Sequence, residues 1–179
     1  PALGVTLDTA PDGELLARSN HVLKSYWAQP EATADALAND WFHTGDGATI
    51  ADDNFATITD RKKDVIISGG ENVSSIEVED TLFSHPAVAE VAVIGVPDDK
   101  WGETIKALVV LTPDSGTGVD AEGQPDEQAL IDHCREKLAH FKCPTSVEFR
   151  DELARTATGK LQKFKLRAPY WEGMAKQVN

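Results

Sequence analysis

Two apolar stretches on either side of a proline-containing turn constrain the fold of this chain most. EVAVIGV, residues 90–96, has the length and β-branched composition of a strand, and Pro97 with two aspartates then turns the chain. The following TIKALVVL, residues 104–111, alternates apolar and other side chains, as in a half-buried strand. DVIIS at 64–68 and SVEF at 146–149 read as further short strands. A small sheet is therefore expected.

Helical patterns lie between and after these strands. Ser74 and Glu77 have the spacing of a capping box, and His85-Pro86 ends the helix that they begin. DEQALIDHCREKLAHF forms a second helix, and a basic helix closes the chain. The second helix places on one face Leu130, Ile131, Cys134, Leu138 and Phe141. The fold class predicted is α+β, with about three strands and three helices in this unit. Ser115–Gly118 reads as a flexible connection within it.

Residues 1–60 do not form a core by themselves. Residues 14–27 read as short strands, and Pro30 can open a short helix. ATIAD at 48–52 and FATITD at 55–60 flank a predicted hairpin turn. Four aromatic residues of this part need a packing partner: Tyr26, Trp27, Trp41 and Phe42. We expect it, in isolation, to be disordered or to pair with another copy in a dimer.

Composition excludes several classes of function. The net charge of −13 argues against nonspecific binding to nucleic acid. A run of eighteen apolar residues is absent, so we expect no transmembrane segment. The sequence begins with Pro1 and shows no signal-peptide pattern, so we expect the chain to be a piece of a longer one. Cys134 and Cys143 suit reduced thiols and a cytoplasmic location. The histidines lack metal-ligand spacing, so no protein-bound metal is expected.

RTATGKL, residues 155–161, raises the question of what Lys160 reaches. A phosphate-binding P-loop would need glycine at Ala154 and Ser or Thr at Leu161, so this is not a P-loop. Three other stretches hold candidate functional residues, and each also has an ordinary structural reading. Asp46 in WFHTGD could accept hydrogen bonds from a vicinal diol, or form an Asx-turn. DRKKD can be a solvated linker, and the glycines of SGGEN can border a ligand or form a plain turn.

Taken together, the motifs resemble the C-terminal third of the adenylate-forming acyl-CoA synthetase superfamily. The resemblance runs from about Gly13 to Leu166 and is nearest to fatty-acyl-CoA and 4-coumarate-CoA ligases. Many independent motifs in one order are far more specific than any single match. The matching stretches are GELLAR, WFHTGD, DRKKDVIISGGENVSSIEVE, HPAVAEVAVIGVPDDKWGE and TATGKLQK.

The resemblance implies a role for each matching position. Asp46 and Arg61 would bind the ribose of ATP, Lys63 would be a hinge, and Lys160 would be the catalytic lysine of adenylation. The CoA side would include Gly69, Gly70, Glu71, Asn72, Trp101 and Phe141. Residues 1–62 would end a large adenylation domain, and 63–179 would form a mobile lid. Cys143 stands where some relatives have an arginine that meets the CoA phosphates, and Ala154 replaces a common proline.

The implied activity is that of an AMP-forming acid–thiol ligase. A small carboxylic acid, expected to be a fatty acid, would be activated by ATP as acyl-AMP and passed to CoA, with Mg²⁺ bound through the nucleotide and not by this chain. The phosphate loop and acyl pocket would lie in an N-terminal adenylation domain absent here, and this fragment alone would be inactive. Two alternatives stay open. The acceptor could be a carrier protein, or the chain could be a non-catalytic module that docks on a separate large subunit.

Overall fold

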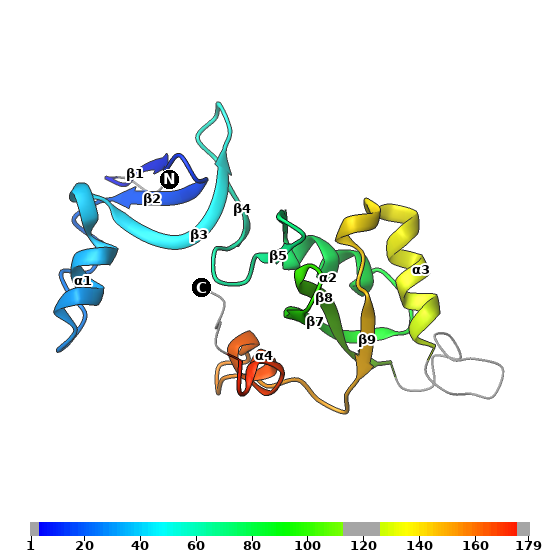
Figure 1. Ribbon diagram of the computed structural model, residues 1–179. Coiled ribbons are helices and arrows are strands. Elements are labelled where there is room, and N and C mark those ends of the chain that lie inside the picture. The colour runs from blue at the N-terminus through cyan, green and yellow to red at the C-terminus, as the bar shows by residue number, and fades with distance from the viewer. Residues whose placement is uncertain (1–3, 113–125, 175–179) are drawn as a thin grey trace. The chain divides into compact units, whose positions relative to one another are not determined.

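The computed structural model describes residues 4–112 and 126–174. The chain divides into two compact units, Pro1–Lys63 and Asp64–Asn179 (Figure 1). Their assignment to a large domain's end and a lid stays a prediction. The connection predicted at Ser115–Gly118 lies outside the described residues.

Unit 1, Pro1–Lys63, is built on an antiparallel sheet in which each strand pairs with the next one along the chain. A short helix, α1 (Pro30–Ala36), and a 3₁₀ turn, Ala38–Asp40, separate the second strand from the third (Figure 1). The strands are β1 (Thr6–Thr9), β2 (Glu14–Arg18), β3 (Phe42–Ile50) and β4 (Ala56–Arg61).

The sequence predicted part of this unit correctly. Pro30 opens α1 as expected, and β3 pairs with β4 across a turn in which Asn54 has a positive φ of 63°. The expectation of strands over residues 14–27 is wrong beyond Arg18, where the chain leaves the sheet. The structure does not show the Asx-turn alternative for Asp46. Asp46 lies in β3, which pairs with both β2 and β4, and Gly45 before it has a φ of 75° at a bulge where the β2–β3 register shifts.

Unit 1 buries few apolar side chains of its own. Leu15 and Ala48 are its buried apolar residues among those described, while Trp27 is 94% exposed. The Trp41 ring lies 4.6 Å from the Arg18 guanidinium, which stacks over it. The unit therefore forms a sheet with little core, as the sequence suggests. Its disorder in isolation, or its pairing with another copy, stays a prediction.

Unit 2, Asp64–Asn179, is built around a five-stranded sheet in the order β6-β5-β8-β7, with β9 parallel to β8. The expectation of about three strands is therefore too low. The two glycines after Ser68 reverse the chain, so the residues that follow pair back on β5 instead of leaving the sheet. The strands are β5 (Ile66–Ser68), β6 (Glu71–Val73), β7 (Val88–Asp98), β8 (Gly102–Leu111) and β9 (Ser146–Phe149).

Helices cover both faces of this sheet. α2 (Ser75–Phe83) and α3 (Glu127–Lys137) pack on one face, and α4 (Lys163–Trp171) contributes Leu166 and Tyr170 to a second cluster on the other. The alternation predicted at 104–111 is confirmed at Ile105, Ala107 and Val109, which are buried in the first cluster. Leu108 departs from it, because this residue is buried in the second cluster on the other face of β8.

The sequence predicts the start of α2 correctly but not the end of α3. Ser74 Oγ accepts a hydrogen bond from the Glu77 amide at 3.3 Å, which confirms that half of the capping box. The predicted helix over 126–141 ends early, at Lys137, so Phe141 lies in a separate 3₁₀ turn, His140–Lys142. Phe141 is 48% exposed and does not share the buried face of α3.

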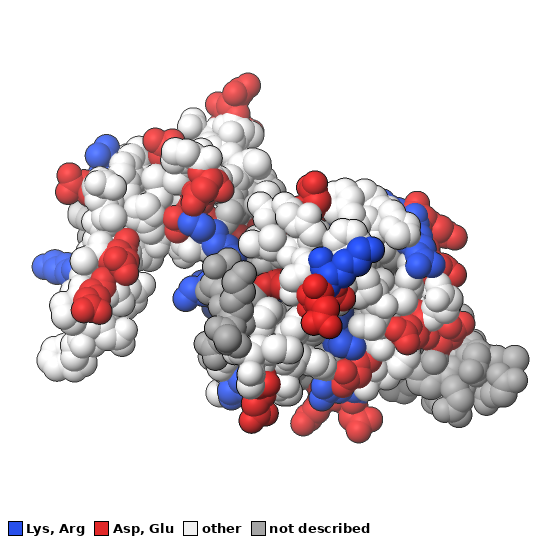
Figure 2. All heavy atoms as spheres, viewed as in Figure 1, with Lys and Arg blue, Asp and Glu red and all other residues white. Residues whose placement is uncertain are grey.

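Charged side chains are distributed over both units. Acidic and basic side chains are interspersed on the face that Figure 2 shows. Among the helices of the described residues, none has the length and apolar character needed to cross a bilayer.

Candidate functional site

The structure brings together the two residues predicted to bind ribose. Asp46 on β3 pairs in register with Arg61 on β4, and Arg61 Nε donates to Asp46 Oδ1 at 2.9 Å. The Asp46 side chain is 30% exposed, so an outer ligand can reach the carboxylate. A carboxylate beside a guanidinium offers both an acceptor and donors for hydroxyl groups.

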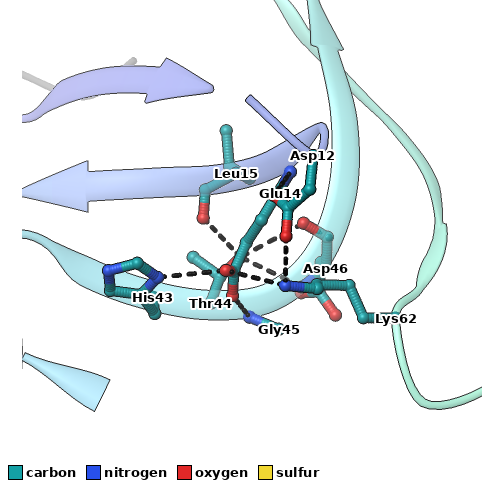
Figure 3. A network of polar contacts seen from close by, with 8 residues as sticks. All are labelled: Asp12, Glu14, Leu15, His43, Thr44, Gly45, Asp46 and Lys62. Atoms are coloured by element: carbon teal, nitrogen blue, oxygen red, sulfur yellow. Dashed lines mark hydrogen bonds and ion pairs between the residues drawn. The ribbon is translucent and has the colours of Figure 1, made fainter. Parts of the chain in front are cut away.

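A buried carboxylate organises the strand segment that holds Asp46. Glu14 on β2 accepts a hydrogen bond from the Gly45 amide at 2.8 Å, and its Oε2 lies 3.0 Å from His43 Nδ1 (Figure 3). Thr44 Oγ1 donates to the Leu15 carbonyl at 2.8 Å. These bonds fix the backbone of β3 on both sides of the bulge, and so they set the direction of the Asp46 side chain.

Lys62 completes this network from the end of unit 1. Its Nζ donates to Asp12 Oδ2 at 2.8 Å and to Glu14 Oε2 at 3.2 Å (Figure 3). Burial alone would raise the pKa of Glu14, but hydrogen bonds from His43, the Gly45 amide and Lys62 lower it below its ordinary value. The hydrogen bond to Asp12 raises the pKa of Lys62. Glu14 and Lys62 are therefore both ionised at neutral pH.

The glycine turn predicted to border the thiol path meets the predicted CoA aromatic. Gly69 donates its amide to the Trp101 carbonyl at 2.9 Å, and Ser68 pairs with Gly102. A Cβ at Gly69 would lie 2.7 Å from Trp101 Cε3, so the indole lies directly against the glycine backbone. Gly69 and Gly70 have φ values of 60° and 89°, a region that favours glycine. Glu71 and Asn72 follow in β6.

Lys160 lies at an exposed turn that is fixed at its base. The Arg155–Leu161 bridge closes the turn, and the Thr156 amide donates to the Lys160 carbonyl at 2.8 Å. Arg155 contributes two contacts, an ion pair with Glu90 at 2.7 Å and a hydrogen bond to the Gly159 carbonyl at 2.7 Å. The turn is thus attached to β7, and the lysine side chain extends from a defined base.

The remaining predicted positions lie in different places. Lys63 is the last residue of unit 1. Phe141 lies beside Lys142, whose Nζ binds the Glu77 carboxylate at 2.7 Å. Cys143 is buried, and burial raises the pKa of its thiol, so the side chain lies in the core as a neutral group. Cys134 and Cys143 are both free thiols, as expected.

The lysine turn and the glycine turn lie at opposite ends of β7. The lysine turn is attached to Glu90 near the start of the strand, while the strand's last residue, Asp98, pairs with Gly102, which also pairs with Ser68. Eight residues of strand separate Glu90 from Asp98, which corresponds to roughly 26 Å. The two turns therefore cannot occupy one small reaction centre at the same time.

Similarity to known proteins extends over most of the chain. Residues 77–160 match the family model of the AMP-binding enzyme C-terminal domain. Two similar sequences are the "Probable CoA ligase CCL11" of Humulus lupulus, 48% identical over 170 residues, and the "Long-chain-fatty-acid--CoA ligase FadD13" of Mycobacterium tuberculosis, 44% identical over 159 residues. These alignments cover 93% and 89% of this chain, but only 29% and 30% of the relatives.

Solved structures are similar to the chain over the same extent. ATP-bound MatB from Rhodopseudomonas palustris has a TM-score of 0.83 and 34% sequence identity, over 97% of this chain and 35% of that one. The chain belongs to the adenylate-forming acyl-CoA synthetase superfamily and corresponds to its C-terminal portion. It spans about 30% of the length of the curated relatives that it matches.

Sequence reasoning missed the residues that support the site. The sequence patterns assign no role to Glu14 within GELLAR or to Arg155 within RTATGKL, and they place Lys62 in a solvated linker. A glutamate within an otherwise apolar strand pattern was the available signal for Glu14, because a buried carboxylate needs donors. The contacts of Lys62 and Arg155 join residues 48 and 65 positions apart, which local patterns do not reveal.

Proposed function

We propose that this chain is the C-terminal part of an ATP-dependent acyl-CoA synthetase that works with a large N-terminal adenylation domain. The observation that carries the proposal is the separation of two turns on one unit, one presenting Lys160 and the other Gly69 and Gly70. An enzyme with two half-reactions can use the two turns one after the other at a single reaction centre, provided that the unit rotates between the half-reactions.

In the first half-reaction, a substrate carboxylate attacks the α-phosphorus of ATP. A new bond forms between a carboxylate oxygen and phosphorus, the bond to the pyrophosphate oxygen breaks, and acyl-AMP and pyrophosphate result. Lys160 places its ammonium where negative charge crowds this centre, and a positioned cation stabilises that charge where water is excluded. Asp46 and Arg61 hold the ribose hydroxyls, and Mg²⁺ is carried by the nucleotide.

In the second half-reaction, a thiol attacks the acyl carbonyl and AMP leaves. Lys63 is the hinge about which unit 2 turns, so that Lys160 leaves and the segment Gly69–Asn72 borders the entering thiol. Trp101 and Phe141 supply apolar surface beside it, and both are about half exposed. We propose CoA as the acceptor, because the similar sequences are named CoA ligases.

We further propose a fatty acid as the acid substrate, which the name of the mycobacterial relative supports. The acyl pocket belongs to the large domain, so residues 1–179 alone are inactive. A carrier-protein acceptor is the second candidate function.

The test is an assay of the full-length enzyme with a series of fatty acids of increasing chain length. We expect acid-dependent pyrophosphate release, followed by acyl-CoA formation when CoA is added. Isolated residues 1–179 should give neither product. Acylation of a phosphopantetheinyl carrier protein in preference to CoA would show that the carrier protein, not CoA, is the acceptor. The absence of pyrophosphate release with every acid would overturn the proposal.

A further inference from the structure

The helix that follows the lysine turn begins with a lysine, at a position where helices disfavour a cation. Lys163 is the first residue of α4, and the first turn of this helix contains no acidic residue. The positive end of the helix dipole lies there, so a lysine is locally unfavourable. Among the described residues, the Gln162 side chain at the N-cap makes no capping hydrogen bond either. The position of Lys163 therefore needs an explanation outside its own helix.

The Lys163 side chain binds to α2. Its Nζ lies 2.7 Å from Glu79 Oε1 and donates to Ser75 Oγ at 2.7 Å. The Lys163 and Glu79 side chains are only 12% and 16% exposed, and Ser75 is fully buried. Exposed ion pairs contribute little because water screens both charges, and that screening is much weaker at this buried pair.

The same glutamate binds the strand to which the other side of the lysine turn is attached. Glu79 Oε1 accepts a hydrogen bond from the Val93 amide of β7 at 2.7 Å. On the first side of the turn, Arg155 is paired with Glu90, three residues earlier on this strand. Three residues of strand correspond to roughly 10 Å. Both sides of the turn are therefore attached to one short segment of β7.

We propose that Lys163 is a positioning residue for Lys160, and that its ion pair with Glu79 fixes the second side of the lysine turn for acyl-AMP formation. This inference rests on the proposed function, and it adds a second attachment to the one at Arg155. Lys163 follows Lys160 by three residues, and Leu161 between them packs against the second cluster. An ammonium stabilises a developing charge best when it is already directed at it, so a loose second side would lower the rate.

The glycine turn should be much less sensitive to the loss of Lys163. The start of α2 has its own support, because Ser74 Oγ accepts the Glu77 amide and Val73 at the end of β6 is fully buried. β6 is also paired with β5 over its whole length. Loss of Lys163 should therefore loosen the lysine turn and leave the segment Gly69–Asn72 in place. We expect the kinetic effect to be confined to the first half-reaction.

The experiment uses the full-length enzyme and three variants: Lys163→Met, Lys163→Met combined with Glu79→Gln, and Lys165→Met. Lys163→Met leaves the Glu79 carboxylate with one donor fewer, which lowers stability. Glu79→Gln removes the charge but keeps an acceptor for the Val93 amide, so the double variant should regain stability without regaining the attachment. Lys165→Met is the control, because it removes an exposed charge from the same helix.

Lys163→Met should slow acyl-AMP formation, measured as pyrophosphate release, by about 10- to 100-fold, which is the equivalent of one lost hydrogen bond to a charged group. Transfer to CoA from supplied acyl-AMP should stay near the unaltered rate, and Lys165→Met should change neither step. The double variant should regain thermal stability but not the rate of acyl-AMP formation. It decides the question if Lys163→Met alone does not fold. Equal slowing of both half-reactions, or an adenylation rate that recovers together with stability, would overturn the proposal.

Hydrogen exchange followed by mass spectrometry separates this inference from the proposed function, because it needs no catalysis. The Gly159 and Gln162 amides donate to the Thr156 and Ala154 carbonyls within the turn. Peptides that contain them should exchange about 10- to 100-fold faster in both variants that lack Lys163, while peptides of β6 should not change. Faster exchange in the turn, without pyrophosphate release from any acid, would support the attachment and refute only the ligase function. Unchanged exchange in the turn would overturn the proposal at any level of activity.

Discussion

Replacing Gly69 with alanine tests the contact between the glycine turn and Trp101. The residue has a φ of 60°, and an added Cβ would lie 2.7 Å from Trp101 Cε3. A left-handed conformation costs a non-glycine residue about 1–2 kcal/mol. The clash adds a further cost, because the indole must move.

Gly70→Ala is the matched control. Gly70 has a φ of 89°, but a Cβ there would meet nothing within 4 Å. Its cost should therefore be about 1–2 kcal/mol from the backbone alone. Trp101 is half exposed and its ring lies 4.4 Å from Lys100 Nζ, so moving it loses a cation–π contact of about 0.5–1 kcal/mol. The difference between the two variants should be of that size.

Urea unfolding followed through NMR signals of unit 2 measures the two stabilities, and the Trp101 indole N–H signal reports its position. We expect that signal to shift in Gly69→Ala and to stay in Gly70→Ala. In the full-length enzyme, Gly69→Ala should then slow thioester formation more than acyl-AMP formation. Equal stability losses with an unmoved indole signal in both variants would refute the reasoning.

Three further predictions concern the hinge, the lysine turn and the buried carboxylate. Lys63→Pro in the full-length enzyme should suppress one half-reaction and spare the other, because proline fixes φ and restrains the preceding residue; equal loss of both would place the hinge elsewhere. Arg155→Met releases the turn from Glu90 and should slow acyl-AMP formation about tenfold, with transfer from supplied acyl-AMP unchanged; an unchanged adenylation rate would exclude a positioning role. Because the pKa of Glu14 is lowered in the folded state, its stabilisation of unit 1 is complete above its ordinary value of 4.5 and is lost as pH falls through the lowered value. Thermal unfolding in acid should show this loss, and Glu14→Gln should flatten the profile; an identical acid profile in that variant would contradict it.

Local patterns predicted the elements of this fold that depend on local chemistry. The cap at Ser74, the helix opened by Pro30 and the strand over residues 90–96 follow from propensity, periodicity and turn residues. The second buried face of β8 was not predicted, because Leu108 is covered by residues of the C-terminal segment that are distant in sequence. Alternation alone cannot show that the intervening positions are also covered.

The candidate site was predicted as separate motifs, and its geometry was not. The sequence motifs indicated Asp46 and Arg61 as site residues, but they did not show that the two residues are cross-strand partners. It likewise named Gly69 and Trp101 without showing their contact. Lys62 was missed because its role depends on a pairing across 48 residues with Glu14. Register and burial are tertiary properties, so they required the folded chain.

The half-reaction specificity of Lys160 tests the central claim most directly. In the full-length enzyme, Lys160→Ala should slow acyl-AMP formation by about a hundred- to a thousandfold, the usual effect of removing one preorganised charge donor. Transfer to CoA from supplied acyl-AMP should remain near the unaltered rate, because the lysine turn is then away from the centre. Gly70→Leu should show the reverse pattern. Pyrophosphate release and AMP release measure the two steps separately. If Lys160→Ala slows both steps to the same degree, the lysine serves both states or is structural, and the rotating-unit account is contradicted.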